Sequence, residues 1–306
     1  MDRINSLVEK IKSLKKEKEA IILAHNYQLP EVQDIADYVG DSLGLAREAT
    51  KVKDSVIVLC GVYFMAETAA ILNPDKAVLI PDKGAGCPLA NFAPTRMVLD
   101  WKKRYSDYAF VAYVNTSAEV KALCDVCCTS SNAVEIVRKI DSKRIVFLPD
   151  KNLGAYVKKM VPEKDILLWP GFCVVHEKAD IESIIKAREE NPGALIIAHP
   201  ECPMEILEIA DGVCSTGQMV DFVKKHPYTR SFIVVTEWGM NYALKKSFPD
   251  RTFIEPLKRM ECKNMKKITL EKVLKSLESL NYEVKLDKEI AENAKKSIVK
   301  MFEMMK

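Results

Sequence analysis

The stretch Ile22-Leu23-Ala24-His25-Asn26 is a short apolar run that ends in polar residues. Similar stretches recur at Val111-Ala112-Tyr113-Val114-Asn115 and at Ile196-Ile197-Ala198-His199-Pro200. Each one leads, after 15 to 17 residues, to a hydroxyl residue that precedes a helix-like stretch, and these residues are Ser42, Ser130 and Ser215. Internal repetition of this kind indicates similar structural units stacked or grouped around common surfaces.

Three cysteines mark a second point of the same repeat. Cys87, Cys173 and Cys262 are 86 and 89 residues apart, and each follows a short apolar run that ends in proline. The runs are Val78-Leu79-Ile80-Pro81, Leu167-Leu168-Trp169-Pro170 and Phe253-Ile254-Glu255-Pro256. We therefore expect three units, at residues 1–92, 93–178 and 179–306, the last with a C-terminal helical tail, and each unit contributes one thiol to a shared place.

The apolar runs predict buried parallel strands that alternate with helices. They are continuous rather than alternating in polarity, as strands covered on both faces are. The expected strands are 20–25, 56–60 and 77–80 in the first unit, 110–114, 144–148 and 166–169 in the second, and 194–199, 232–236 and 252–254 in the third. Strands that alternate with helical patterns predict an α/β fold, here three similar α/β domains with short parallel sheets.

Composition excludes several classes of protein. The chain has 306 residues, with 48% hydrophobic and 29% charged residues and a net charge of +3, which gives no electrostatic footprint for nucleic acid. No apolar run approaches the roughly 20 residues of a membrane span, and the N-terminus lacks the apolar core of a signal peptide. We expect a cytoplasmic protein, whose nine cysteines would then be metal ligands or buried thiols rather than disulfides.

Polar side chains follow the first strand of each unit. In a parallel α/β sheet, ligands bind outside the carboxyl ends of the strands. The residues there are His25, Asn26 and Tyr27 in the first unit, Tyr113 and Asn115 in the second, and His199 and Glu201 in the third. Each could be an ordinary loop or capping residue, but their recurrence at one repeat position favours a common site.

The hydroxyl residues allow two interpretations. Asp41-Ser42, Thr129-Ser130-Ser131-Asn132 and Ser215-Thr216-Gly217 are good sequences for capping the start of a helix. Helix N-termini also bind anions through their free amide groups and the positive end of the dipole. If three such ends converge, they would bind a multiply charged anion such as a phosphate or a dicarboxylate.

The repeat cysteines suggest a metal centre. A zinc site with three cysteines usually takes a histidine as well, and a 4Fe–4S cluster normally takes four cysteines. A cluster with three would leave one iron open to act as a Lewis acid on substrate. The Cys124-Asp125-Val126-Cys127-Cys128 segment contains a Cys-x-x-Cys without a second pair, so we interpret it as structural.

A set of motifs along nearly the whole chain resembles the quinolinate synthase family, the enzymes of NAD biosynthesis that build the pyridine ring. The motifs are Ala24-His25-Asn26-Tyr27-Gln28, Gly40-Asp41-Ser42, Asn73-Pro74, Cys87-Pro88-Leu89-Ala90, Tyr113-Val114-Asn115, Thr129-Ser130-Ser131-Asn132-Ala133, Pro149-Asp150-Lys151-Asn152-Leu153, Gly171-Phe172-Cys173-Val174-Val175-His176, His199-Pro200-Glu201-Cys202, Ser215-Thr216-Gly217 and Cys262-Lys263-Asn264-Met265-Lys266. One departure is Phe172, where many relatives have a histidine before the cysteine.

The resemblance implies a fold, a cofactor and a reaction. The three domains would be related by a pseudo-threefold axis with the active site on it, and one 4Fe–4S cluster would be held by Cys87, Cys173 and Cys262. The enzyme would be a carbon–carbon bond-forming transferase that condenses iminoaspartate with dihydroxyacetone phosphate and releases phosphate and two waters. The enzyme that produces iminoaspartate would be a candidate partner.

The resemblance also assigns roles to the polar residues. The acids, bases and oxygen-polarising donors would be His25, Tyr27, Tyr113, His176, His199 and Glu201, with Glu201 the central catalytic carboxylate. The substrate-binding residues would be His25, Ser42, Tyr113, Asn115, Ser130, His199, Glu201, Ser215 and Thr216. Two other functions fit the same cysteines: a non-catalytic iron–sulfur or redox sensor, and a zinc-dependent lyase.

Overall fold

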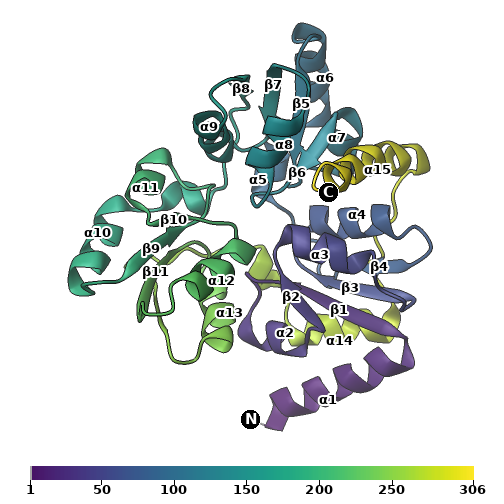
Figure 1. The fold of residues 1–306 in the computed structure, drawn as a ribbon. Helices are drawn as coiled ribbons and strands as arrows, with labels where there is room; N and C mark the ends of the chain where they lie inside the picture. The colour runs from purple at the N-terminus through teal and green to yellow at the C-terminus, as the bar shows by residue number, and fades with distance from the viewer. Residues whose placement is uncertain (1) are drawn as a thin grey trace. The chain divides into compact units, whose positions relative to one another are not determined.

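The computed structural model describes residues 2–306 and contains three parallel sheets of four strands each (Figure 1). The strand orders are β2-β1-β3-β4, β6-β5-β7-β8 and β10-β9-β11-β12, so all three sheets have the same topology. Helices separate the strands along the chain. The predicted class, α/β with three similar sets of short parallel strands, is confirmed.

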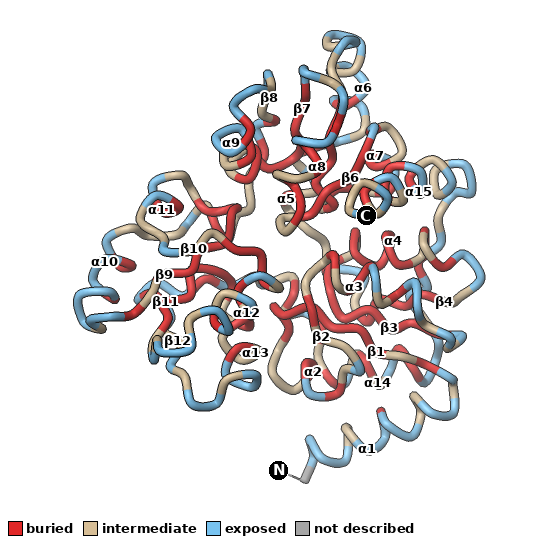
Figure 2. Tube along the Cα trace, in the orientation of Figure 1, coloured by how far each residue is buried: buried red, intermediate tan, exposed pale blue. Residues whose placement is uncertain are grey.

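The first sheet contains β1 (Ala20–His25), β2 (Tyr38–Gly40), β3 (Val56–Cys60) and β4 (Ala77–Leu79). The central strand β3 is buried at every residue, because helices cover both faces of the sheet (Figure 2). In Figure 1, α3 (Ser42–Ala49) and α4 (Tyr63–Leu72) lie on one face, and α1 (Asp2–Glu17), α2 (Pro30–Ile35) and α14 (Leu270–Ser279) lie on the other.

The second sheet contains β5 (Ala109–Tyr113), β6 (Val126–Cys128), β7 (Arg144–Leu148) and β8 (Asp165–Leu168). Its helices are α5 (Pro88–Asn91), α6 (Thr95–Arg104), α7 (Ala118–Leu123), α8 (Ala133–Lys139) and α9 (Lys151–Met160). The last helix, α15 (Lys288–Glu303), packs beside β6, where the Ser297 hydroxyl lies 3.3 Å from the Cys127 sulfur and donates to the Lys121 carbonyl at 2.8 Å.

The third sheet contains β9 (Leu195–Ala198), β10 (Gly212–Val213), β11 (Ser231–Val235) and β12 (Thr252–Ile254). Its helices are α10 (Ile181–Glu190), α11 (Met204–Ile209), α12 (Thr216–Lys225) and α13 (Gly239–Ser247). Two 3₁₀ turns, η1 (His176–Lys178) and η2 (Met265–Lys267), follow Cys173 and Cys262.

The expected number of strands per sheet was wrong. The sequence predicted three strands in each unit, and each sheet has a fourth, namely β2, β6 and β10. These strands are two or three residues long and lie at sheet edges, so they pair with one neighbour and need no apolar run. They also place the hydroxyl residues, because Ser42, Ser130 and Ser215 each come just after one of them.

The chain divides into two compact units. One contains the residues up to Cys87 together with Cys262–Ala291, and the other contains Pro88–Glu261 with Glu292–Lys306. The first unit holds the β1–β4 sheet, and the second holds the other two sheets. The three-unit division at residues 92 and 178 stays a prediction. Within residues 2–306, no helix has both the length and the apolar character needed to span a membrane.

Candidate functional site

The turn that follows β9 presents His199 and Glu201. The Glu201 amide donates to His199 Nδ1 at 3.3 Å, and the Cys202 amide donates to the His199 carbonyl at 2.9 Å. Pro200 lies between these two residues in the sequence. Its ring fixes its φ angle, which restricts the backbone conformation of the turn. Both side chains are buried, so the turn places a titratable pair in the protein interior.

The loop that follows β8 presents Cys173 and His176. Asp150, at the start of α9, accepts a hydrogen bond from the Cys173 amide at 2.9 Å, and the Lys151 amide donates to the Gly171 carbonyl at 2.7 Å. A Cβ at Gly171 would lie 2.4 Å from the Pro149 carbonyl oxygen, so only glycine fits where the loop passes. These contacts fix the path of the loop that carries Cys173.

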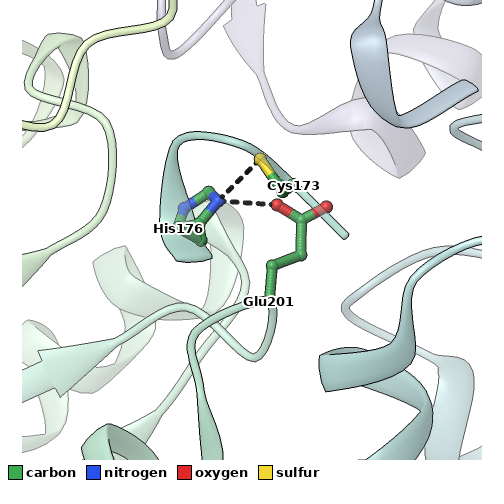
Figure 3. Close-up of side chains that lie close together, drawn as sticks. All are labelled: Cys173, His176 and Glu201. Carbon is green, nitrogen blue, oxygen red and sulfur yellow. Dashed lines mark hydrogen bonds and ion pairs between the residues drawn. The ribbon is translucent and has the colours of Figure 1, made fainter. Parts of the chain in front are cut away.

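Cys173, His176 and Glu201 meet in the second of the two compact units, the one that contains Pro88–Glu261 (Figure 3). His176 Nδ1 lies 3.2 Å from Cys173 Sγ and 2.8 Å from Glu201 Oε2. The other ring nitrogen, Nε2, lies 2.8 Å from the Thr236 hydroxyl, and the His176 ring stacks on His199 with a centroid separation of 4.6 Å. His176 is only 1% exposed, so its neighbours determine where its proton lies.

Glu201 is an ionised buried carboxylate. Burial alone would raise its pKa, but the charges of His199 and His176 and hydrogen bonds from His176 and Tyr113 lower the pKa to about 2. Asn115 Nδ2 also lies 3.4 Å from Glu201 Oε1. A carboxylate with this pKa stays ionised near neutral pH, and it can accept hydrogen bonds from the two imidazoles and orient them for proton transfer.

Asp150 shows the opposite behaviour. Its burial and the negative charge of Glu201 raise its pKa well above the usual value, although amide hydrogen bonds from Leu153, Cys173 and Asn152 act in the other direction. Two nearby buried carboxyl groups therefore have pKa values pushed apart by their surroundings. Such pairs are common where a protein needs one acidic and one basic group.

Asn152 connects the loop and the turn. Its Nδ2 donates to Glu177 Oε2 at 2.7 Å and to the Glu201 carbonyl oxygen at 3.0 Å. Lys151 Nζ lies 2.5 Å from the other oxygen of Glu177, the residue next to His176. Phe172, the residue before Cys173, packs its ring on Phe92 at 4.8 Å, and the Lys151 ammonium lies 4.8 Å from the ring centre.

In the first unit, the turn after β1 presents His25 and Tyr27. The Tyr27 amide donates to His25 Nδ1 at 3.1 Å, and the two rings meet edge to face at 4.5 Å. Lys266 Nζ donates to the Tyr27 carbonyl. Gly40 pairs with His25 across the sheet, and Ser42, two residues after Gly40, is the first residue of α3. His25, Tyr27 and Ser42 thus all follow strand ends on the carboxyl side of this sheet, and their role in binding stays a prediction.

The hydroxyl residues take different places at the helix starts. Ser215 caps α12 in a reciprocal capping box with Gln218, and Thr216 is the first residue of the helix. At α3 the cap is Asp41, which accepts from the Gly44 amide at 2.7 Å, and Ser42 is the first helical residue. Ser130 lies in the turn before α8, and Gln218 Nε2 bonds the adjacent Ser131 carbonyl at 3.1 Å, which joins the starts of α8 and α12.

The nine cysteines form two groups by burial. The repeat cysteines Cys87, Cys173 and Cys262 are half-buried, whereas the other six are buried. Burial raises the pKa of each of those six thiols, which are Cys60, Cys124, Cys127, Cys128, Cys202 and Cys214. The repeat cysteines are therefore the accessible thiols of the chain, and the other six have the character of structural ones.

Comparison with known proteins shows the family. Residues 9–303 match the model of the Quinolinate synthetase A protein family. This chain belongs to the quinolinate synthase family. The quinolinate synthases of Caldicellulosiruptor saccharolyticus and Thermodesulfovibrio yellowstonii are 49% and 50% identical to it, over 98% and 99% of this chain and 99% of each relative. That of Pyrococcus furiosus is 50% identical over 99% of this chain and all of the relative.

A solved structure, the UDP-GlcNAc 2-epimerase of Neisseria meningitidis, aligns with a TM-score of 0.17 and 14% identity over 83% of this chain and 69% of its own, which supports no conclusion.

Six of the residues singled out in the sequence lie together in the second compact unit: Tyr113, Asn115, Cys173, His176, His199 and Glu201. Sequence reasoning gave no role to Asp150, Asn152 or Thr236. The first two lie in the quoted Pro149–Leu153 motif, and Thr236 directly follows β11.

Proposed function

We propose that this chain condenses iminoaspartate with dihydroxyacetone phosphate to form quinolinate, phosphate and two waters. The observation that carries the proposal is the buried, ionised Glu201 held between His176 and His199 beside the Cys173 thiol. The reaction needs several proton transfers on carbonyl and imine substrates. A carboxylate and two imidazoles within hydrogen-bonding distance of one another can supply them, typically for about 100- to 10,000-fold in rate.

We assign Glu201 as the central base, with His176 and His199 as its proton-transfer partners. Thr236 holds the Nε2 side of the His176 ring, so that Nδ1 faces Glu201 and Cys173. Tyr113 hydrogen-bonds Glu201 and lies with Asn115 at the carboxyl end of β5. In the first unit, His25 and Tyr27 would polarise substrate oxygens from an equivalent turn.

The substrates and product carry phosphate and carboxylate groups. Ser42 and Thr216 are first residues of helices, where free amides and the dipole favour anions. Ser215 caps α12, Ser130 lies in the turn three residues before α8, and Gln218 hydrogen-bonds from the first segment to the second. We assign these four hydroxyl residues, with Asn115, to binding the charged groups of the substrates.

The residues fit the 4Fe–4S cluster that the family implies. Cys87, Cys173 and Cys262 would hold it, since they are the half-buried thiols while the other six are buried. With three thiolate ligands the cluster would supply one iron as a Lewis acid for a substrate oxygen. Substituting any of the three cysteines should remove the iron, whereas Cys60→Ala and Cys214→Ala should leave it in place.

The test is product formation from the two small substrates. The full-length chain, prepared without air and with its iron and sulfide measured, is mixed with dihydroxyacetone phosphate and freshly generated iminoaspartate, and quinolinate is measured by mass spectrometry. We expect quinolinate and phosphate in equal amounts. Iron and sulfide without product would favour the redox-sensor function, and zinc without sulfide would favour the lyase.

A further inference from the structure

We propose that Cys173, His176 and Glu201 form a binding site for one Zn²⁺ ion in chains that lack an iron–sulfur cluster. Each residue offers one ligand atom, and these atoms all lie within 4.8 Å of one another. Within residues 2–306, this is the group of three His, Cys, Asp or Glu side chains that meets that condition. All three come from the second compact unit.

The distances are close to those of a zinc tetrahedron. With zinc bonds of about 2.0–2.1 Å to nitrogen and oxygen and about 2.3 Å to sulfur, neighbouring ligand atoms would be about 3.4–3.6 Å apart. His176 Nδ1 now lies 2.8 Å from Glu201 Oε2 and 3.2 Å from Cys173 Sγ. The Cys173 sulfur and the Glu201 oxygen lie within 4.8 Å of each other, so side-chain movements of at most about 1 Å would give all three pairs the tetrahedral spacing. Three protein ligands leave a fourth position for water.

The donor set selects zinc among the common cations. A thiolate and an imidazole are poor ligands for Mg²⁺ and Ca²⁺, which take oxygen, and good ones for Zn²⁺. Each ligand also has a partner that orients it, as metal ligands usually do. Thr236 holds His176 Nε2 at 2.8 Å, Asp150 accepts from the Cys173 amide at 2.9 Å, and Asn115 lies 3.4 Å from the second oxygen of Glu201.

Binding would replace protons with the ion. The Cys173 S–H bond breaks, a Zn–S bond forms and the proton leaves to solvent. His176 releases any proton on Nδ1 to solvent and binds zinc through that atom, while its Nε2–H donates a hydrogen bond to the Thr236 hydroxyl oxygen. Glu201 binds as the carboxylate. Bound zinc would occupy a thiol proposed for the cluster and the proposed base together, so it would oppose both cluster assembly and turnover.

The experiment measures metal binding on the cluster-free, full-length chain. Zn²⁺ affinity is determined by competition with a chromophoric chelator, and Co²⁺ serves as the spectroscopic probe of the ligands. We expect one ion per chain and a sulfur-to-cobalt charge-transfer band with the intensity of one thiolate. Cys173→Ser should abolish the band, and His176→Gln and Glu201→Gln should each weaken Zn²⁺ affinity at least about tenfold. Thr236→Val should weaken it by about 10- to 100-fold, because the Thr236 hydroxyl no longer holds the His176 ring through Nε2.

Matched variants separate this site from the other thiols. Cys87→Ser and Cys262→Ser replace the equivalent repeat cysteines, and Cys124→Ser replaces a buried one; all three should bind Zn²⁺ as the wild type does. Thermal melts confirm that each variant is folded, and Glu201→Gln remains informative if Cys173→Ser is not. A three-thiolate band, or loss of binding in Cys87→Ser or Cys262→Ser, would overturn the proposal whether or not the chain makes quinolinate.

Discussion

The turns His25–Tyr27 and His199–Glu201 have the same backbone design in two different sheets. In each, the amide two residues on donates to the histidine Nδ1, at 3.1 and 3.3 Å, and the next amide donates to the histidine carbonyl, at 2.9 Å in both. The carbonyl of the third residue in each turn also accepts a side-chain hydrogen bond. Lys266 donates to the Tyr27 carbonyl, and Asn152 donates to the Glu201 carbonyl.

The two turns differ in what the third side chain contacts. Tyr27 places an aromatic ring edge-on to His25 at 4.5 Å, whereas Glu201 places an ionised carboxylate against His176 at 2.8 Å. The internal repeat has kept the backbone and changed the chemistry. In the proposed reaction, the Glu201 turn moves protons and the Tyr27 turn orients and polarises substrate.

Replacing Glu201 by glutamine should have the largest effect on this comparison. The amide keeps the size and hydrogen-bonding capacity of the side chain but cannot accept a proton as a carboxylate does. We expect kcat to fall by about 100-fold or more, with the iron content and melting temperature close to wild type. Steady-state quinolinate formation measures the loss. Turnover within a few-fold of wild type would leave Glu201 only a binding role.

Tyr27→Phe should have a smaller effect, because it removes one hydroxyl and keeps the ring on His25. A hydrogen bond to a charged group contributes about 1.5–3 kcal/mol, so kcat/KM should fall at least about tenfold. Kinetics at saturating and limiting dihydroxyacetone phosphate separate binding from turnover. If Tyr27→Phe lowered kcat as much as Glu201→Gln, the different roles proposed for the two turns would be wrong.

Asn152→Ala tests how the Glu201 turn is held. It removes the hydrogen bonds to Glu177 and to the Glu201 carbonyl, each worth about 1 kcal/mol. We expect a loss of about fivefold in kcat, and a larger loss for Asn152→Asp, whose carboxylate would face the Glu177 carboxylate.

Asn191 provides the matched control for Asn152. Its Nδ2 also donates to a backbone carbonyl, that of Ala187 at 2.9 Å, at the end of α10 and outside the site. Asn191→Ala should leave kcat unchanged. Equal losses in the two alanine variants would show that the effect of Asn152 is a general loss of stability.

Lys266→Met should give the smallest change. It removes the donor to the Tyr27 carbonyl, but the segment after Cys262 keeps the contact of the buried Met265 sulfur with Gln28 at 3.5 Å. A partly exposed bond of this kind contributes about 0.5 kcal/mol, so kcat/KM should fall only about twofold. If activity fell further in Lys266→Met than in Asn152→Ala, the His25–Tyr27 turn would depend more on its side-chain hydrogen bond than the His199–Glu201 turn does.

Much of the fold could be predicted because the central strands are continuous apolar runs. β1, β3, β7 and β12 begin and end where the sequence placed them. The edge strands β2, β6 and β10 could not be found in this way, since a strand of two or three residues carries no pattern. Each of them pairs with the first strand of its sheet, which is β1, β5 or β9. Tertiary packing determines this pairing.

The site was predictable where chemistry recurs with the repeat, as at His25 and His199. The supporting residues were not, because they act on backbone groups: Asp150 accepts from the Cys173 amide, and Asn152 donates to the Glu201 carbonyl. Contacts between a side chain and a backbone group produce no recognisable residue spacing in the sequence. Likewise, Asp41 and not Ser42 caps α3, a choice that depends on local backbone geometry.

The central claim is that His176 and Glu201 act as one proton-transfer unit. The most direct test measures kcat for His176→Gln, Glu201→Gln and the double variant, each with its iron content determined. Residues that act together are strongly non-additive, so we predict that the double variant retains a kcat within a few-fold of the slower single variant. Losses that multiply in the double variant would contradict the account.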